Sequence, residues 1–245
     1  MNGSAWFVAS PRDWFGDHVL LDTGETHHAL HVLRIAPGEV ITVSDGRGTV
    51  ARCSVGALRD GRVAAEIIDQ RVESRPEPEI VLYQAAPKGS KIDAIVQRSA
   101  ELGVAELCVF ESLRSVVRWE PPKLQRLATR WKAAARVVAK QSRNPYLMRT
   151  GPVLKWAELI DRITGEPCAL TLWEDASERL RAALPDRVSR VALVVGPEGG
   201  FSTEEAATLA AAGAAPVSLG PRIFRTEMAP LVAASAVLWH YGVIG

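Results

Sequence analysis

The segment VVGPEGGFSTEE, residues Val194 to Glu205, decides how the second half of the chain is built. A run of apolar residues ends at a glycine-rich turn, and Ser202 with Glu205 forms the capping-box pattern of a helix start. Strand, glycine turn and helix in this order commonly cradle a phosphate. This turn contains Glu198 and no lysine, and it matches neither the Walker phosphate loop nor the dinucleotide fingerprint. The sequence therefore predicts a ligand that is neutral or cationic near Glu198.

A second glycine turn, LGPRIFRTEMAP, covers residues 219–230 and precedes an apolar segment. It contains two arginines and one acid, and Thr226 is the predicted N-cap of the helix that follows. Glycine turns after neighbouring strands of a doubly wound sheet together form its ligand crevice. We therefore expect the two turns to build one site. The alternative, a tight turn with surface arginines, is weaker because the two turns lie so close in the sequence.

The pattern from residue 79 alternates apolar strands with amphipathic helices. This order is typical of a parallel α/β sheet that helices cover on both sides. The last helix, at about 227–241, is apolar nearly all round, which indicates burial in the core or in a subunit interface. We favour the interface, and the core helix stays open. Strands are expected at 79–86, 106–110, 168–175, 190–196 and 216–220, and earlier helices at 91–104 and 121–142.

The first 72 residues have a different, mainly β pattern. Residues 39–55 predict a hairpin around a DGRG turn, and 62–71 predict another strand. Residues 23–35 have helical spacing. We expect a small β-barrel with one inserted helix over residues 1–72. The proline-rich segment 75–79 then separates it from a second domain at 76–245.

The composition is that of an ordinary globular protein, with 47% hydrophobic and 23% charged residues among 245. The three cysteines form no C-x-x-C pair, so neither a disulfide framework nor a cysteine zinc site is expected. His27 and His31 lack a third ligand, and we expect no metal site. No signal peptide and no apolar run of membrane length is apparent. These features favour a protein of the reducing cytoplasm.

The net charge of +1 conceals a basic central segment. Residues 76–150 have a net charge of +6, whereas the segments before and after them have −2 and −3. No acid lies between Glu120 and Glu158. This one-sided run favours contact with a nucleic-acid backbone over a merely solvated helix face. Its nine bases are Lys123, Arg126, Arg130, Lys132, Arg136, Lys140, Arg143, Arg149 and Lys155.

The two glycine turns followed by an apolar helix closely resemble the 16S ribosomal RNA (uracil-N3)-methyltransferase family, RsmE, of the SPOUT superfamily. HVLRIAPGE, KIDAIVQRSAELGV and QSRNP are similar to other segments of that family, in the same order. The resemblance implies an N-terminal PUA-like β-barrel that helps bind RNA, and a C-terminal α/β domain with a deep trefoil knot. It also implies a homodimer that uses S-adenosylmethionine to methylate uridine N3 at position 1498 of 16S ribosomal RNA on the assembled 30S subunit.

The resemblance further implies roles for particular residues. Arg225 or Arg222 would stabilise the developing uracil anion, and Glu198 or Glu227 would accept its proton. The cofactor would lie against Leu172, Trp173, Val195, Gly196, Pro197, Glu198, Gly199, Gly200, Ser218, Leu219, Gly220, Ile223, Phe224 and Arg225. The RNA would contact His31, Arg34, Lys88, Arg114, Arg136, Lys140 and Arg143.

Some positions depart from the family pattern. Phe224 and Met228 stand where a leucine and a threonine are common, and Lys140 stands where a glutamate is frequent. Two other functions therefore stay in view. A related enzyme would methylate another RNA, such as tRNA, with the same cofactor site. The other alternative is a non-enzymatic protein that binds RNA, and Met228 is the only residue that supports it.

Overall fold

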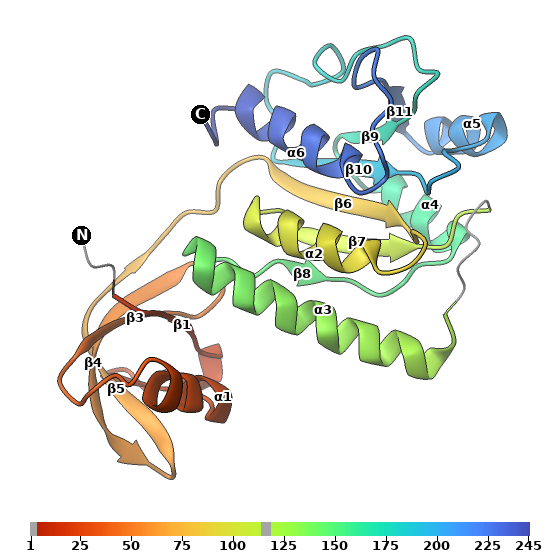
Figure 1. Ribbon diagram of the computed structural model, residues 1–245. Coiled ribbons are helices and arrows are strands. Elements are labelled where there is room, and N and C mark those ends of the chain that lie inside the picture. Colours follow the sequence, from red (N-terminus) through yellow and green to blue (C-terminus); the bar gives the residue numbers. More distant parts are fainter. Residues whose placement is uncertain (1–3, 114–118) are drawn as a thin grey trace. The chain divides into compact units, whose positions relative to one another are not determined.

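The computed structural model describes residues 4–113 and 119–245 (Figure 1). The chain forms two compact units, Met1–Arg75 with Arg136–Leu147, and Pro76–Ala135 with Met148–Gly245. Residues 136–147 were predicted to belong to the second domain, and they pack in the first unit instead. The reason is a set of ion pairs and hydrogen bonds that the sequence pattern does not reveal.

The first unit contains a five-stranded sheet in the order β1-β3-β4-β5-β2. β1 pairs with β3 in parallel, and the other pairs are antiparallel. The predicted hairpin and the strand that follows it are confirmed as β3, β4 and β5. Phe7, Leu21 and Ile41 are buried in the core of this unit. The strands are β1 (Trp6–Val8), β2 (His18–Leu20), β3 (Val40–Ser44), β4 (Thr49–Arg59) and β5 (Arg62–Val72).

The helical segment of the first unit begins at Thr23, as predicted, and then changes from an α-helix to a wider π-helical turn. Helix α1 (Thr23–His27) is capped by Asp22, whose carboxylate accepts the backbone N–H of Glu25 at 2.8 Å. A π-helical turn, His28–Val32, continues it.

The last residues of helix α3 (Pro121–Ser142) supply the charges that the first unit needs. The Glu25 side chain is only 5% exposed, and Lys140 Nζ lies 3.0 Å from both of its oxygens. Arg136 Nε lies 3.2 Å from the same carboxylate, and Arg136 also pairs with Asp22. The buried carboxylate is therefore compensated by two cations of α3.

The segment QSRNP and the residue after it also pack in the first unit. The Pro145 carbonyl accepts Ser44 Oγ at 3.0 Å and the Gly48 N–H at 3.2 Å. The Tyr146 hydroxyl donates to the Glu73 carbonyl. Gly48 has a φ of +112°, and a Cβ there would collide with the Tyr146 hydroxyl. Glycine is therefore required where this segment crosses the hairpin turn.

The second unit contains a six-stranded sheet in the order β11-β9-β10-β6-β7-β8, and all its strand pairs are parallel. The predicted α/β fold class is confirmed, and the trefoil knot stays a prediction. β8, with two residues, was too short to predict. The strands are β6 (Glu79–Ala85), β7 (Glu106–Phe110), β8 (Arg149–Thr150), β9 (Ala169–Leu172), β10 (Arg190–Val195) and β11 (Ala214–Val217).

Helices cover both faces of this sheet (Figure 1). α4 (Trp156–Thr164) and α5 (Thr203–Ala211) pack on one face around Phe110 and Phe201. α2 (Lys91–Glu101) and α6 (Ala229–His240) contact each other on the opposite face. The predicted capping box of α5 is confirmed, since Ser202 Oγ accepts the Glu205 N–H at 3.1 Å and Glu205 accepts the Ser202 N–H at 2.9 Å.

Helix α6 is only partly buried in the single chain. Ala233 and Val237 face the core, whereas Met228, just before the helix, and Trp239 are 42% and 63% exposed. Together with Val232 and Ala236 they form an apolar stripe along one side of the helix. Among the described residues, no helix combines the length and apolar character needed to cross a membrane.

Candidate functional site

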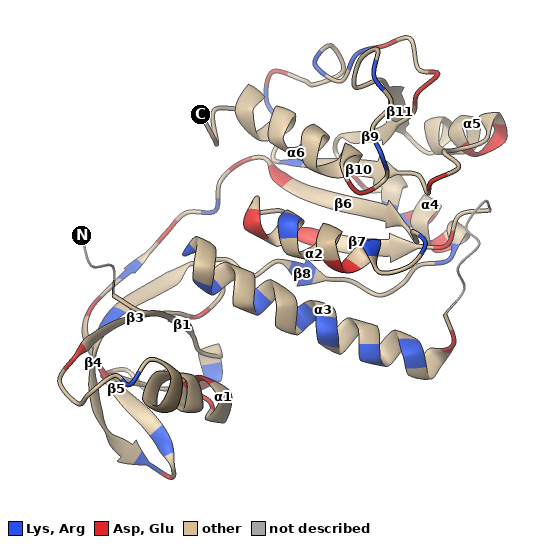
Figure 2. Cartoon of the chain, viewed as in Figure 1, with Lys and Arg blue, Asp and Glu red and all other residues tan. Residues whose placement is uncertain are grey.

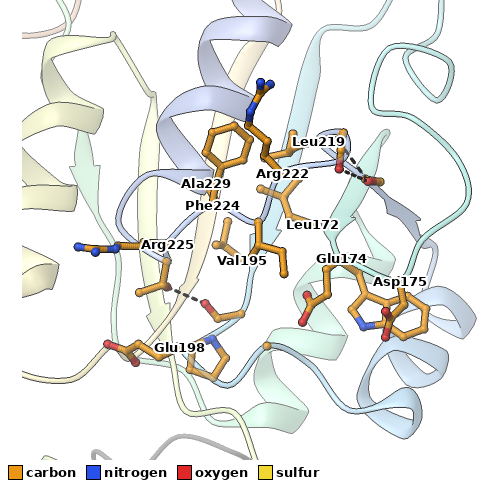
Figure 3. A pocket seen from close by; sticks show the side chains of 18 of the residues that line it. Leu172, Glu174, Asp175, Val195, Glu198, Leu219, Arg222, Phe224, Arg225 and Ala229 are labelled. Atoms are coloured by element: carbon orange, nitrogen blue, oxygen red, sulfur yellow. Dashed lines mark hydrogen bonds between the residues drawn. The ribbon is translucent and has the colours of Figure 1, made fainter.

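A cavity of about 600 Å³ lies at the carboxyl ends of β9, β10 and β11 in the second unit (Figure 3). This volume is within the range of small-molecule sites, roughly 300–1,000 Å³. Its walls are the loops at 172–175, 195–200 and 218–226, with Lys91 and Ala229. All the residues predicted to hold the cofactor line this cavity except Gly199. The structure thus brings the two glycine turns together, and their contact with a cofactor stays a prediction.

Strand pairing explains why loops so distant in sequence meet. Leu172, the last residue of β9, is in register with Val195 at the end of β10 and with Val217 at the end of β11. Because the three strands are parallel and end at the same level, the loops that leave them share one edge of the sheet.

Thr226 joins two of these loops instead of capping the last helix. Its hydroxyl donates to the Gly196 carbonyl at 2.8 Å and accepts Gln84 Nε2 at 3.0 Å, and all three groups are buried. The N-cap of α6 is Met228, without a side-chain hydrogen bond. The predicted N-cap was wrong because the hydroxyl satisfies a buried carbonyl of the neighbouring loop.

Gly200 is the position where a carboxylate approaches the glycine loop most closely. Its φ is +63°, and a Cβ at this position would lie 2.6 Å from Glu174 Oε1. The left-handed backbone therefore favours glycine here, whereas the exposed Glu174 side chain could turn away from a Cβ. Figure 3 shows Glu174 and Asp175 on one side of the cavity, with Glu198 and Arg225 on the other.

Glu198 is held by groups outside its own loop. Lys91 Nζ lies 2.8 Å from its carboxylate, and the Lys88 N–H donates to it at 3.1 Å. Partial burial would raise the pKa of Glu198, but the hydrogen bonds from Lys91 and from backbone N–H groups outweigh it and hold the pKa below its ordinary value. Glu198 is therefore ionised near neutral pH and already paired. Lys91 was missed because it is 107 residues away in sequence.

Glu227 differs from Glu198 in having an oxygen without a hydrogen bond. Its Oε2 is shielded from solvent and has no hydrogen-bond partner in the described chain, and Lys91 Nζ lies 3.6 Å away. Arg222 and Arg225 are exposed and make no ion pair with any described acid. In Figure 3 these two arginines point away from each other.

The residues predicted to contact RNA fall into three groups. His31, Arg34, Lys88 and Arg143 are exposed. Arg136 and Lys140 are engaged by acids of the first unit, as described above, and their RNA contact stays a prediction. Arg114 lies outside the described residues.

Figure 2 shows the bases as blue bands along α3, and two bases of the run pair with acids of other elements. Arg130 lies 2.7 Å from Asp93, and Arg149 lies 3.1 Å from Glu106. Lys123, Arg126 and Lys132 are exposed and have no acidic partner in the described chain. The unpaired bases of α3 are therefore fewer than the sequence suggests.

No cluster of three potential metal-binding side chains occurs among the residues that the structure describes. The rings of His27 and His31 lie 4.9 Å apart between centroids and are tilted by 42°.

Comparisons with known proteins agree with this architecture. The family profile described as RNA methyltransferase domain matches residues 74–238, and the profile described as RNA methyltransferase PUA domain matches residues 21–68. The chain is 33% identical to ribosomal RNA small subunit methyltransferase E of Mycobacterium bovis, over 91% of this chain and 86% of that protein. It is 30% identical to the protein of the same name from Bacillus subtilis, over 88% of each chain.

Solved structures give the same result. The ribosomal RNA small subunit methyltransferase E of Neisseria gonorrhoeae, solved with bound S-adenosylmethionine, superimposes with a TM-score of 0.84 at 27% identity. The match covers 96% of this chain and 97% of that one. A methyltransferase of Legionella pneumophila, solved in complex with the same cofactor, gives a TM-score of 0.85 at 27% identity, with the same coverage of both chains.

Proposed function

The chain belongs to the ribosomal RNA small subunit methyltransferase E family, and from this premise we propose that it methylates N3 of a uridine in 16S ribosomal RNA with S-adenosylmethionine. The observation that carries the proposal is the cavity at the ends of β9, β10 and β11, where the two glycine turns meet. By resemblance, the target is uridine 1498 on the assembled 30S subunit, which places the enzyme in the cytoplasm.

The residues of the cavity suit a cation that has an aromatic base and no phosphate. Glu174 and Asp175 line the side of the cavity opposite Arg225, and their carboxylates would favour a sulfonium there. Leu172 and Val195 form an apolar floor for a flat ring. The backbone of the glycine turns is free of side chains that would block a close approach. These features support binding of S-adenosylmethionine by the loops that the sequence predicts.

The reaction also requires that the proton on uracil N3 be removed. In the transfer, the N3–H bond breaks, the nitrogen electron pair forms the N3–methyl bond, and the methyl–sulfur bond breaks with its electrons moving to sulfur. We assign the proton to Glu227, because its Oε2 accepts no hydrogen bond in the described chain and lies 3.6 Å from Lys91 Nζ. Glu198 suits this role less well, since its carboxylate already accepts hydrogen bonds from Lys91 Nζ at 2.8 Å and from the Lys88 N–H at 3.1 Å. Arg225 borders the same cavity and would stabilise the developing charge on the uracil oxygens.

Contact with ribosomal RNA needs exposed basic side chains, and His31, Arg34, Lys88 and Arg143 provide them. We retain these four as RNA contacts. If the substrate is the assembled subunit, methylation of intact 30S particles will be much faster than methylation of naked 16S RNA.

A homodimer is part of the same proposal. The exposed apolar stripe of Met228, Val232, Ala236 and Trp239 supports it, because such a stripe is normally covered in solution. Analytical ultracentrifugation of the wild-type chain should give twice the chain mass, and Trp239→Glu should give a monomer. A monomeric wild-type protein would exclude the dimer.

Two experiments test the proposed activity: calorimetry with S-adenosylmethionine, and mapping of methylated nucleotides in cellular RNA. We expect saturable cofactor binding by the folded protein and loss of one N3-methyluridine from 16S RNA in cells that lack the gene. No binding would exclude the enzyme and favour an RNA-binding relative. Loss of a modified nucleotide from tRNA instead would assign the activity to another RNA.

A further inference from the structure

A second cavity, of about 500 Å³, adjoins the first one in the same unit. Its lining comes from two elements, Ala94 and Arg98 of helix α2 and the segment from Ile223 to Met228 before α6. Ile223, Phe224 and Arg225 line both cavities. The two cavities thus adjoin along this segment, and ligands in them would lie next to each other.

We propose that this second cavity receives the target base, and that Arg98 and Arg225 read the two uracil oxygens on either side of N3. The proposal rests on the function proposed above and goes further by naming where the base binds and what selects it. A methyl group passes between ligands only when the donor and acceptor atoms approach to about 3–3.5 Å. The second cavity is the candidate for this approach because it adjoins the first at Ile223, Phe224 and Arg225.

The polar groups of the cavity match the uracil edge. That edge presents an acceptor, a donor and an acceptor, namely O2, N3–H and O4. The cavity offers the complementary set, with a guanidinium from Arg98, the carboxylate of Glu227 and a guanidinium from Arg225. Neither arginine pairs with an acid among the described residues, so both are available to a ligand.

The remaining lining suits a flat ring. Phe224 is half-buried and borders both cavities, so its ring can stack on the base while the base edge faces the polar groups. Cytosine presents an acceptor at N3 and an amino group beside it. The N3 lone pair of cytosine would face the Glu227 carboxylate, and its amino group would face an arginine, which is also a donor. The cavity would therefore reject cytosine.

Arg98 is the informative residue because it lines only the second cavity. Its side chain is exposed on α2, so its removal should leave the fold intact. We expect Arg98→Ala to lower kcat/KM for methylation of small ribosomal subunits about 10- to 100-fold, which is the effect of losing one charge-assisted hydrogen bond. Arg98→Lys keeps the positive charge, and its kcat/KM should lie between those of the wild type and Arg98→Ala. Affinity for S-adenosylmethionine should stay within about twofold of wild type.

Ala94→Leu gives an independent test, because it fills the second cavity and not the first. Leucine is a good helix former, and Gln97→Leu on the exposed side of the same helix is the matched control. Ala94→Leu should lose methylation while it binds S-adenosylmethionine normally by calorimetry. Gln97→Leu should behave as wild type in both assays.

The possible outcomes separate this proposal from the one on which it rests. If the wild-type protein does not bind S-adenosylmethionine, or modifies another atom, the proposed function fails. If the wild type is active and both Arg98→Ala and Ala94→Leu retain at least half of its kcat/KM, the second cavity is not the base site. If either variant loses activity only together with a fall in assembly mass in ultracentrifugation, loss of the dimer accounts for the result and the proposal is overturned.

Discussion

Substitution of Lys140 tests whether the end of α3 is structural or serves RNA. The Lys140 ammonium is 3.0 Å from both oxygens of Glu25, whose side chain is only 5% exposed. Breaking a buried ion pair by removing one partner costs about 3–5 kcal/mol. Arg136 remains 3.2 Å from the same carboxylate in Lys140→Ala, so we expect the lower end, about 3 kcal/mol. For a chain of this size that corresponds to a fall in Tm of about 6–12 °C.

Differential scanning calorimetry at neutral pH measures this change, and Lys132→Ala is its matched control. Lys132 is exposed on the same helix and has no acidic partner in the described chain, so its removal should change stability by less than about 0.5 kcal/mol. A double substitution, Glu25→Gln with Lys140→Met, should recover part of the loss because no unpaired charge remains. If Lys140→Ala melts together with Lys132→Ala and binds ribosomal RNA more weakly, the structural role is refuted.

Three further predictions concern the glycine loop and its supports. Gly200→Ala should weaken S-adenosylmethionine binding about tenfold in calorimetry because its φ is +63°, whereas Gly199→Ala, whose Cβ meets nothing within 4 Å, should bind as wild type. The pKa of the Glu198 carboxyl, measured by NMR, should lie below its ordinary value of 4.5 and should rise in Lys91→Met. Because a lowered pKa stabilises the folded state above pH 4.5, the wild type should lose more stability than Lys91→Met on acidification below that pH. Equal losses of stability would contradict the pairing of Glu198 with Lys91. Glu205→Ala should lower the free energy of unfolding by about 1–3 kcal/mol in denaturant titration, because two backbone N–H groups lose their acceptor.

Local signals predicted most of the fold, because they depend on neighbours in sequence. The capping box at Ser202 and the hairpin around the DGRG turn are each complete within a few residues, and both are confirmed. Alternation around the turn predicted β3 and β4, residues 62–71 predicted β5, and apolar runs predicted β6, β7, β9 and β10. The last strand was expected at 216–220 and lies at Ala214–Val217. β1, β2 and β8 have only two or three residues, too few for a period of two to appear.

Contacts over long distances in sequence could not be predicted. Lys91 meets Glu198 across 107 residues, and Gln84 meets Thr226 across 142. In the sequence, Lys91 has the local role of a helix-face base and Thr226 that of a helix cap. Only the folded sheet shows that they fix the loops around the cavity. The same limit applies to Lys140, whose buried partner lies in the first unit.

The order of the cavity walls along the chain has a consequence for biosynthesis. Each wall is a loop that leaves β9, β10 or β11, and the last of them ends at residue 226 of 245. A nascent chain leaves the ribosome with its N-terminus first, so the first unit and most of the large sheet emerge before this wall exists. The cavity is complete only when β11 has been synthesised and has paired with β9. A nascent chain truncated before residue 218 therefore lacks the wall at 218–226 and has no complete cavity.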